Sequence, residues 1–392
     1  MRQGWEIKKL GEVCTIERGG SPRPIQAYIT ESDDGINWIK IGDATDGSKY
    51  ITSTKEKIKP EGMKKSRFVH KGDFILSNSM SFGRPYILAV DGCIHDGWLV
   101  IHDDSNRFDK NYLYYYLGSP NIYNEFKRLA VGGVVNNLNS ELVRSVNVCI
   151  PPREEQERIV AELDCLSGVI EKKREQLREL DALAQSIFYQ MFGDPITNEK
   201  GWEVSTIENV CSSIVRGPFG SALKKEYFVE QSNTTYKVYE QKHAIQKDSS
   251  IGTYYISADM FEALSRFEIK EGDIIMSCSG TIGEFYEIPI GAEKGIMNQA
   301  LLKYTLNKNI HKIYFLYVME WVKENFEKKG SGLQNIGSVK TIKSTDISLP
   351  PLTLQQEFAD KIEAIEKQKE LIKQSITQTE KLFNSRMDCY FK

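Results

Sequence analysis

The 392-residue chain lacks the usual sequence marks of a membrane protein, an exported protein and a nucleotide-binding enzyme. It has no run of about 18 or more apolar residues, which a membrane-spanning helix needs. Residues 1–13, "MRQGWEIKKLGEV", contain no apolar core of a signal peptide. Neither a Walker A sequence nor a Gly-x-Gly-x-x-Gly loop occurs. We therefore expect a cytoplasmic protein with no nucleotide-binding loop of its own.

Residues that commonly carry catalysis or bind metals are also scarce. The 5 histidines show no metal-ligand spacing, and the 7 cysteines include no Cys-x-x-Cys pair, which is typical of a reduced protein with structural thiols. Cys14 and Cys211 occupy equivalent positions in a repeat described below, and we expect both in the core. "HDG" at 95–97 is interpreted as a hairpin turn. The sequence predicts neither a catalytic residue nor a metal site.

Neither sign of charge is in large excess, since the net charge is only -3. A composition that is 40% hydrophobic and 27% charged is typical of a globular protein. A lone nucleic-acid binder usually carries a basic excess, although basic patches can exist on a mildly acidic molecule.

What the chain does contain is an internal duplication. Five pairs of segments match in the same order, and the offset within each pair stays between 197 and 200 residues. The pairs are "GWEIKKLGEVC" (4–14) with "GWEVSTIENVC" (201–211), "ERGGSPRP" (17–24) with "VRGPFGSAL" (215–223), "KGDFILSNSMSFG" (71–83) with "EGDIIMSCSGTIG" (271–283), "GGVVNNL" (132–138) with "GSGLQNI" (330–336), and "IPPREEQERIVAELDCL" (150–166) with "LPPLTLQQEFADKIEAI" (349–365). We infer two copies of one fold. Residues 25–70 and 224–270 share almost nothing, and we expect them to set what each copy recognises.

Each copy divides into a globular part and a long helix. "RFVHKGDFILS" and "RFEIKEGDIIMS" indicate strands around a Gly-Asp turn, and "YILAVDGCIHDGWLVIH" and "YEIPIGAEKGIMNQALLKYTL" indicate hairpins around glycine. One helix per copy is expected in "NYLYYYLGSPNIYNEFKRLA" and "KIYFLYVMEWVKENFEKK". The predicted class is α+β. The predicted domains are 1–152 (first globular domain), 153–192 (first long helix), 193–351 (second globular domain) and 352–392 (second long helix).

The helix after each Pro-Pro pair is the clearest structural signal. Apolar residues recur at alternating spacings of four and three, which is typical of a coiled-coil seam. Lys173 interrupts the first run, and Lys369 and Thr379 interrupt the second. Because so narrow a stripe needs a partner, we predict that the two helices pair as an antiparallel coiled coil, with the two globular domains related by a pseudo-twofold. The predicted pairing residues are Ile159, Leu163, Leu166, Ile170, Leu177, Leu180, Ile187, Phe358, Ile362, Ile365, Ile372, Ile376 and Phe383.

Together these segments resemble the specificity subunit of type I restriction-modification enzymes over essentially the whole chain. The motifs that carry the resemblance are "GWEIKKLGEV", "KGDFILSNSMSFG", "VVNNLNSELVRSVNVCIPPREEQERIVAELD" and their second-copy counterparts. The "IPPREEQERI" type of segment after a globular unit is highly specific to this family. The second copy departs from it by carrying Leu-Thr-Leu at 352–354, where the first has Arg-Glu-Glu.

The resemblance implies two target-recognition domains, each reading one half of a split site in double-stranded DNA. It implies that the helices separate these domains and dock two adenine methyltransferase subunits, which restriction subunits can join. The chain itself would be non-catalytic, and S-adenosylmethionine, ATP and Mg would be bound only by the partner subunits. Helix length would then act as a ruler for the DNA spacer between half-sites.

Three alternatives remain open. A nuclease or methyltransferase in its own right would need an acidic metal cluster, a cofactor loop or an Asn/Asp-Pro-Pro-Tyr/Phe loop, but the Pro-Pro pairs here follow Ile150 and Leu349. The specificity chain of a type IIB-like system shares the layout. A two-domain protein-binding scaffold could also use a coiled coil as its connector. The neighbouring genes would discriminate between the last two and the main interpretation.

DNA contacts are expected in the Gly-rich loops and in the segments that differ between the copies. Arg favours guanine and Asn or Gln favours adenine, while Lys, Ser and Thr commonly contact phosphate. Such loops are also ordinary turns, and lysine clusters are often solvated faces. The predicted residues in the first copy are Ser21, Arg23, Lys40, Arg67, Asn78, Ser79, Ser81, Arg84, Asn136 and Asn137. Those in the second copy are Arg216, Ser221, Lys224, Lys242, Ser279, Thr281, Ser331 and Gln334.

Overall fold

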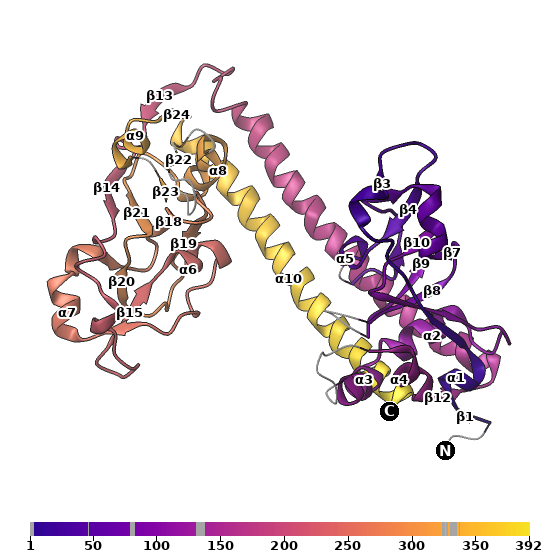
Figure 1. Cartoon of the computed structure of the whole chain (residues 1–392). Helices are drawn as coiled ribbons and strands as arrows, with labels where there is room; N and C mark the ends of the chain where they lie inside the picture. The colour runs from indigo at the N-terminus through magenta and orange to yellow at the C-terminus, as the bar shows by residue number, and fades with distance from the viewer. Residues whose placement is uncertain are drawn as a thin grey trace. The chain divides into compact units, whose positions relative to one another are not determined.

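A computed structural model describes residues 4–45, 47–78, 83–130, 138–323, 326 and 338–392, and the backbone alone of 328–329 and 335–336 (Figure 1). The chain forms two compact units: unit 1 is Met1–Glu175 with Ile372–Lys392, and unit 2 is Gln176–Leu371. Each unit therefore includes one end of both long helices. The predicted domain boundaries, which separate globular parts from helices, stay a prediction.

Unit 1 is built on two mixed five-stranded sheets. The first has the order β2 (Thr15–Arg18), β11 (Trp98–His102), β8 (Phe74–Ser77), β9 (Pro85–Leu88), β5 (Tyr50–Ile51). The second has the order β3 (Ile29–Thr30), β6 (Glu56–Ile58), β4 (Ile36–Ile39), β10 (Gly92–Ile94), β7 (Arg67–Val69). A separate antiparallel pair joins β1 (Glu6–Lys9) to β12 (Asn147–Ile150). The helices are α1 (Leu10–Val13), α2 (Lys110–Leu117), α3 (Pro120–Ala130), α4 (Ser140–Ser145) and the 3₁₀ turns η1 (Ile25–Ala27), η2 (Ile41–Asp43) and η3 (Pro60–Lys65).

Unit 2 repeats this plan with two four-stranded sheets in place of the two five-stranded ones. Its first sheet has the order β14 (Cys211–Arg216), β21 (Leu301–Leu306), β18 (Ile274–Ser277), β19 (Phe285–Glu287), and its second the order β16 (Tyr255–Ile256), β15 (Tyr236–Tyr239), β20 (Gly295–Met297), β17 (Glu268–Ile269). The pairs β13 (Glu203–Thr206) with β24 (Asp346–Leu349) and β22 (Lys328–Lys329) with β23 (Asn335–Ile336) stand apart. The helices are α6 (Gln241–Gln246), α7 (Ala258–Ala263), α8 (Lys312–Val322), α9 (Val339–Lys343) and the 3₁₀ turns η4 (Lys225–Tyr227) and η5 (Ser265–Phe267).

The strand pairings confirm the duplication. In each unit a central strand, β11 or β21, lies antiparallel between two neighbours, β2 and β8 or β14 and β18. In the other sheet, β10 and β20 each pair parallel with one strand and antiparallel with another. The α+β class and the Gly-Asp turns are confirmed, since the amides of Asp73 and Asp273 close turns onto His70 and Lys270 at 3.0 and 3.1 Å.

The predicted glycine hairpins are wrong. β9, β10 and β11 follow one another in the chain, but β10 lies in a different sheet from the other two, and the same is true of β19, β20 and β21. The glycines mark close backbone approach instead of a turn. A Cβ on Gly92 would lie 2.6 Å from the carbonyl oxygen of Asn37, and one on Gly295 would lie 2.1 Å from that of Lys237.

The single helix predicted at residues 111–130 is also wrong, because the segment forms two helices. Gly118 caps α2, with its amide donating to the carbonyl of Tyr114 at 3.0 Å, and α3 begins at Pro120. Proline has no amide hydrogen and fits the first turn of a helix, so it permits a new helix here but not continuation of the old one.

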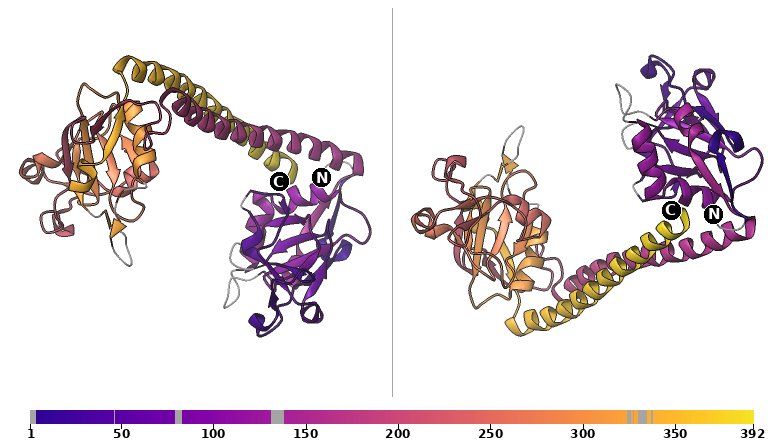
Figure 2. Two further views of the ribbon diagram at one scale, coloured as in Figure 1. Left: turned by 90° about the horizontal axis from the view of Figure 1, so that it is seen from above. Right: turned by 90° about the horizontal axis from the view of Figure 1, so that it is seen from below.

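The two 40-residue helices α5 (Arg153–Phe192) and α10 (Leu352–Phe391) pair antiparallel within each unit (Figures 1 and 2). In unit 1 Glu162 bonds Arg386 at 2.8 Å and Arg174 bonds Glu380 at 2.7 Å. In unit 2 Asp181 pairs with Lys369 at 2.7 Å. The order of these partners along the chain gives the antiparallel direction.

The predicted pairing residues lie on the packed side of the helices. The buried ones are Ile159, Leu163, Ile170, Phe358, Ile362 and Ile365. The half-buried ones are Leu166, Leu177, Leu180, Ile187, Ile372, Ile376 and Phe383. The seam changes at the end of α5, where Phe188 and Phe192 are buried while Ile187 is half-buried. These phenylalanines pack on Phe358 and on Tyr314 of α8, because here the helix joins an aromatic core as well as its partner helix.

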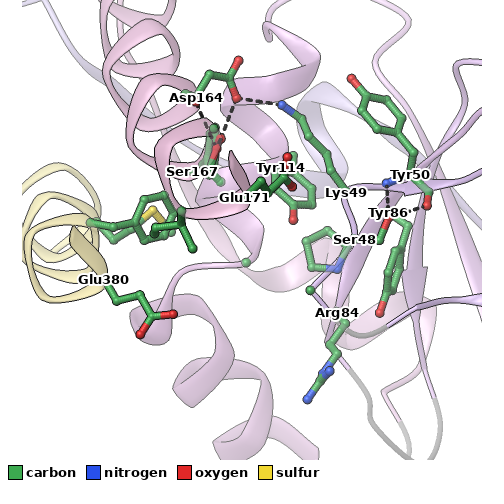
Figure 3. Close-up of a pocket in the computed structure, with 18 of the residues that line it drawn as sticks. Ser48, Lys49, Tyr50, Arg84, Tyr86, Tyr114, Asp164, Ser167, Glu171 and Glu380 are labelled. Atoms are coloured by element: carbon green, nitrogen blue, oxygen red, sulfur yellow. Dashed lines mark hydrogen bonds and ion pairs between the residues drawn. The ribbon is translucent and has the colours of Figure 1, made fainter. Parts of the chain in front are cut away.

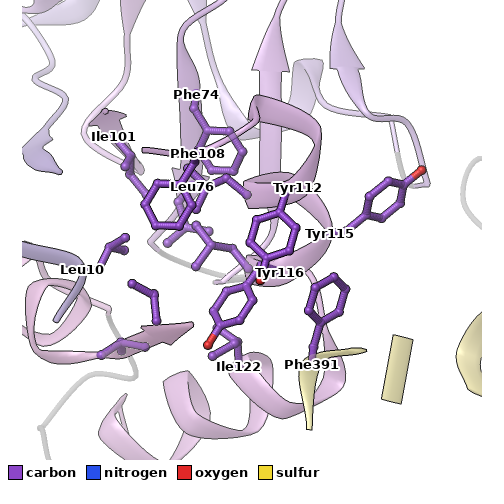
Figure 4. Close-up of a cluster of buried hydrophobic side chains, with 14 of the residues drawn as sticks. Leu10, Phe74, Leu76, Ile101, Phe108, Tyr112, Tyr115, Tyr116, Ile122 and Phe391 are labelled. Atoms are coloured by element: carbon purple, nitrogen blue, oxygen red, sulfur yellow. The ribbon is translucent and has the colours of Figure 1, made fainter. Parts of the chain in front are cut away.

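The end of α10 is built into the core of unit 1 in the same way (Figure 4). Phe391 lies 5.7 Å from the ring of Tyr112 and 5.5 Å from that of Tyr116. Burying a phenylalanine side chain contributes about 1.5–3 kcal/mol. The long helices are therefore extensions of the two globular cores.

Each Pro-Pro pair is followed by a glutamine that the structure buries and whose side-chain oxygen and nitrogen both form hydrogen bonds. The Oε1 of Gln156 accepts from the amide of Asp109 at 2.7 Å, and its Nε2 donates to the carbonyl of Pro151 at 3.0 Å. The equivalent Gln355 accepts from His311 at 2.7 Å and donates to Pro350 at 2.8 Å. Each glutamine fastens the start of a long helix to the residue that caps α2 or α8.

Candidate nucleic-acid interface

Several of the predicted loop residues of unit 1 meet at one end of its first sheet, where β2 and β8 end and β11 begins. Asp96 is the centre of this group. Its carbonyl oxygen accepts from Nε of Arg18 at 2.9 Å and from Nδ2 of Asn78 at 3.1 Å. Its carboxylate accepts from the hydroxyl of Ser21 at 2.9 Å. The structure thus brings together Ser21 and Asn78, which lie 57 positions apart in the chain.

Two more predicted arginines lie in the same group. A guanidinium nitrogen of Arg23 is 3.6 Å from the carboxylate of Asp96, and the Arg23 side chain is 82% exposed. Arg67 donates from Nε to the carbonyl of Arg18 at 2.9 Å and pairs with Glu17 at 2.8 Å. Three guanidinium groups therefore lie near the end of β2, two held on backbone carbonyls and one largely exposed, where they could meet phosphate or guanine.

The hydrogen bonds of His95 assign its protonation. Its Nδ1 accepts from the amide of Gly97 at 2.9 Å, so Nε2 carries the hydrogen that faces the Asp96 carboxylate at 2.9 Å. Burial lowers the pKa of His95. Partial burial would raise the pKa of Asp96, but the bond from Ser21 and the charges of His95 and nearby arginines hold it below its usual range. At neutral pH this centre is an ionised carboxylate beside a neutral imidazole.

Beside this centre lies a cavity of about 1030 Å³. Its walls include Pro22, Arg23, Trp38, Lys40 and His95, and the rings of Trp38 and His95 meet edge to face at 5.8 Å. The predicted Lys40 is ion-paired with Glu56 at the cavity wall. The cavity combines an apolar wall with donors and acceptors, as recognition sites commonly do.

Unit 2 has the same backbone arrangement at the equivalent end. Nε of Arg216 donates to the carbonyl of Gln299 at 3.3 Å, as Arg18 does to that of Asp96. A Cβ on Gly19 would lie 2.3 Å from a carbonyl oxygen of the neighbouring turn, and one on Gly217 would lie 1.8 Å from its counterpart. Both positions therefore require glycine, which explains the repeated Arg-Gly pair.

The remaining predicted residues of unit 2 are more scattered. Ser279 is half-buried and Thr281 exposed on the turn after β18, where the Thr281 carbonyl accepts from Ser277 at 2.5 Å. Ser221 and Lys224 lie exposed on the loop after β14, and Lys224 pairs with Glu226 at 3.4 Å.

Lys242 lies at the start of α6, a helix that packs against β18 and β19 of the first sheet. It pairs with Glu240 at 2.7 Å, and its ammonium group lies 5.5 Å from the ring centre of Tyr254. These contacts fit a structural lysine as well as a DNA contact.

Arg84 belongs to a different place in unit 1. It lines a cavity of about 640 Å³ between the globular part and the long helices (Figure 3). There Lys49 bonds Asp164 of α5 at 3.0 Å, and the hydroxyl of Tyr115 donates to the same carboxylate at 2.5 Å. These contacts fasten the domain to α5. The predicted Ser79, Ser81, Asn136, Asn137, Ser331 and Gln334 lie outside the described residues.

Sequence reasoning missed Arg18, Asp96, Phe219 and Gln299. The repeat could have identified Arg18, because "ERGG" aligns it with the predicted Arg216. "HDG" was interpreted as a hairpin turn. Its counterpart in the second copy is "NQA" at 298–300, directly before β21. Phe219 carries no polar signal, but its side chain is 87% exposed in the loop after β14.

No group of metal-ligating side chains was found among the described residues. Burial raises the pKa of the Cys14 thiol to about 12, and burial also raises that of Cys211 to about 12. Cys14 is buried and Cys211 half-buried, as expected for core residues. In the part of the chain that the structure describes, no helix is long and apolar enough to cross a membrane.

The fold and site define a class: a duplicated α+β protein in which each unit holds an arginine on a backbone carbonyl at one end of its first sheet, with a long helix after each globular part. A family model for the type I restriction modification DNA specificity domain matches residues 2–181 and 199–381. The chain therefore belongs to the family of type I restriction-modification specificity subunits.

Relatives of known name agree over nearly the whole chain. The putative type I restriction enzyme MjaX specificity subunit of Methanocaldococcus jannaschii is 23% identical over 403 aligned residues, covering 97% of this chain and 91% of that protein. The EcoKI specificity subunit of Escherichia coli K12 is 20% identical, covering 93% and 82%.

Solved structures share the fold. A chain from a study of complex assembly and conformational transition of the type I R-M system has a TM-score of 0.63 at 18% identity, covering 100% of this chain and 98% of the other. The S subunit of a type I system from M. genitalium has a TM-score of 0.53 at 13% identity, covering 98% and 95%.

Proposed function

We propose that this chain is the non-catalytic subunit that reads the two halves of a split DNA site. The observation that carries the proposal is the repeated arginine at the end of β2 and β14, held on a backbone carbonyl in both units. The side chains around it differ, with Ser21 and Asp96 in one unit and Phe219 and Gln299 in the other. The same frame with different contacts suits two different half-sites.

The partners follow from the family. We propose that two adenine methyltransferase subunits dock on this chain and that restriction subunits join through them. S-adenosylmethionine, ATP and Mg would be bound by those partners, and the complex would work in the cytoplasm.

The long helices would set the DNA spacer. A helix of 40 residues is about 60 Å long at 1.5 Å per residue, so each added turn would move a recognition domain by about 5.4 Å. Inserting one heptad at matched positions in α5 and α10 should lengthen the spacer. An unchanged spacer would rule the ruler out.

The test is methylation mapping. The chain is co-expressed with the methyltransferase from its own locus in a host free of adenine methylation, and modified adenines are read by single-molecule sequencing. Two short half-sites around a fixed spacer would support the proposal. An active methyltransferase that assembles with the chain but produces no such motif would favour a protein-binding scaffold.

A further inference from the structure

The loop after β14 in unit 2 carries an unusually exposed aromatic side chain. Phe219 is 87% exposed, whereas its neighbour Pro218 is buried. We propose that Phe219 inserts between adjacent base pairs of the half-site read by unit 2. This inference rests on the proposed function and adds a specific contact to it.

The backbone around Phe219 is fixed, which an inserting side chain requires. Gly217 passes so close to the turn before β21 that no Cβ fits, and its amide donates to the carbonyl of Leu301 at 3.0 Å. The amide of Ala222 closes a turn onto the carbonyl of Phe219 at 2.8 Å. The side chain is thus held on a rigid projection.

The neighbours of Phe219 are those of a DNA-reading loop. Arg216 lies three residues before it and is held on the carbonyl of Gln299. Gly220 lies against the Gln299 side chain, since a Cβ there would be 3.1 Å from Oε1. Lys224 and Lys225 follow on the exposed side of the loop. Arginine and lysine would contact phosphates, and glutamine can bind adenine, on either side of an inserted ring.

Exposure alone would not support the proposal, because Ile290 is 92% exposed in the same unit. Ile290 lies at the opposite end of β18, where the amide of Gly291 donates to the carboxylate of Glu271 at 2.7 Å. This is the end of the sheet away from Arg216, which pairs with Leu302 beside Met276. Ile290 is therefore a matched control for loss of an exposed apolar side chain.

Unit 1 has no such ring at the aligned position. The repeat places Ser21 opposite Phe219, and the Ser21 hydroxyl is engaged by Asp96. We therefore expect insertion in one half-site only. Because pyrimidine–purine steps unstack most easily, the half-site of unit 2 should contain TA or CA/TG at the insertion point.

The experiment uses the full chain assembled with its methyltransferase. 2-Aminopurine is placed at each step of the mapped half-site of unit 2, and its fluorescence reports unstacking. Apart from the target adenine, which an adenine methyltransferase flips out of the stack, the wild type should give a bright signal at one step. Phe219→Ala should remove this signal and weaken binding about 10- to 100-fold, the range expected for a lost base–aromatic contact. Phe219→Trp should retain both, and Ile290→Ala should match the wild type.

The slope of affinity against salt should be the same for Phe219→Ala and the wild type, because a neutral ring releases no counterions. Unchanged fluorescence and affinity in Phe219→Ala, with the mapped motif intact, would overturn the insertion alone. Failure of the wild type to select any split motif would overturn the proposed function itself.

Discussion

The two units match closely where the globular part meets the long helices and diverge at the far end of the first sheet. At the helix junction, Tyr112 donates to the carbonyl of Cys149 at 3.0 Å, and Tyr314 donates to that of Ser348 at 2.7 Å. At the sheet end, the backbone carbonyls of Asp96 and Gln299 each accept a hydrogen bond from an arginine Nε, but the two residues carry different side chains. A contact to a backbone carbonyl survives side-chain change, so the frame can stay while the recognised sequence varies.

The largest expected effect tests the junction. Phe358→Ala should cost about 3–5 kcal/mol of unfolding free energy, because the ring is buried against Phe188, Phe192 and Tyr317 at 5.6, 5.3 and 5.0 Å. The equivalent Ile159→Ala in unit 1 should cost about 2–5 kcal/mol.

Urea unfolding of the full chain measures both losses. Leu371→Ala, at a side chain that is 60% exposed, is the control and should change little. A loss below about 1 kcal/mol for Phe358→Ala would contradict the aromatic core at the end of α5.

The buried glutamines come next. Gln156→Ala and Gln355→Ala should each cost about 2–4 kcal/mol, because a buried amide and a buried carbonyl lose their partners at roughly 1–2 kcal/mol each. Gln156 also donates to the carbonyl of Arg107 at 2.9 Å, so its loss should be the larger. The same unfolding measurement checks this order, with the exposed Gln356→Ala as control. Equal, small losses would mean that water replaces the amide.

The arginines test the divergent end. Arg18→Ala should weaken discrimination in only one half-site, and Arg216→Ala only in the other, by about 1–3 kcal/mol each. Libraries that randomise one half-site at a time, scored by methylation, give both effects. Arg18→Lys keeps the charge but cannot repeat the Nε geometry, so it should recover affinity more than selectivity. A variant that damaged both half-sites equally would show a general stability defect.

The sequence allowed the duplication, the α+β class and the long paired helices to be predicted, because each depends on local patterns. The sheet assignment could not be predicted in the same way. "YILAVDGCIHDGWLVIH" contains adjacent strands that join two sheets, and only the long-range pairing of β10 with β4 determines this. Asp96 was missed for the same reason, since its partners Arg18, Ser21 and Asn78 come from distant segments.

The two units also differ in the side chain that accepts from one equivalent backbone amide, and this difference predicts a response of stability to acid. The amide of Lys40 donates to Asp43 in unit 1, while the equivalent amide of Glu240 donates to Nδ1 of the buried His243 in unit 2, both at 2.8 Å. Burial lowers the pKa of His243, and the charge of Lys237 adds to this. The stability from neutral His243 should be complete above about pH 6.5, the usual pKa in an unfolded chain. It should be lost as pH falls toward the folded pKa, because the unfolded chain gains a proton first.

Unfolding free energy measured between about pH 7.5 and 5 should therefore fall less steeply in His243→Asn, whose side-chain oxygen can still accept from Glu240. His95→Asn should flatten the fall in unit 1 in the same way, because burial also lowers the pKa of His95. An unchanged slope in His243→Asn would place the acid sensitivity elsewhere.

The smallest effect is expected at the lysines inside the helix seam. Lys369 is 14% exposed and bonds Asp181 and Glu366 at 2.7 and 2.6 Å, and these bonds outweigh the effect of burial and raise its pKa. Lys173 in unit 1 bonds only the hydroxyl of Ser375 among the contacts the structure describes. Lys369→Met loses two ion pairs with exposed carboxylates but gains apolar packing, so stability should change by no more than about 1 kcal/mol in either direction.

Lys173→Met should be equally mild, whereas Lys369→Glu should destabilise unit 2 because it places a third carboxylate beside Asp181 and Glu366. Urea unfolding of the three variants separates these cases. If Lys369→Met proved strongly destabilising, the ion pairs would be essential to pairing of the helices in unit 2. The interruptions in the apolar repeat would then define helix register, instead of being positions that the seam merely tolerates.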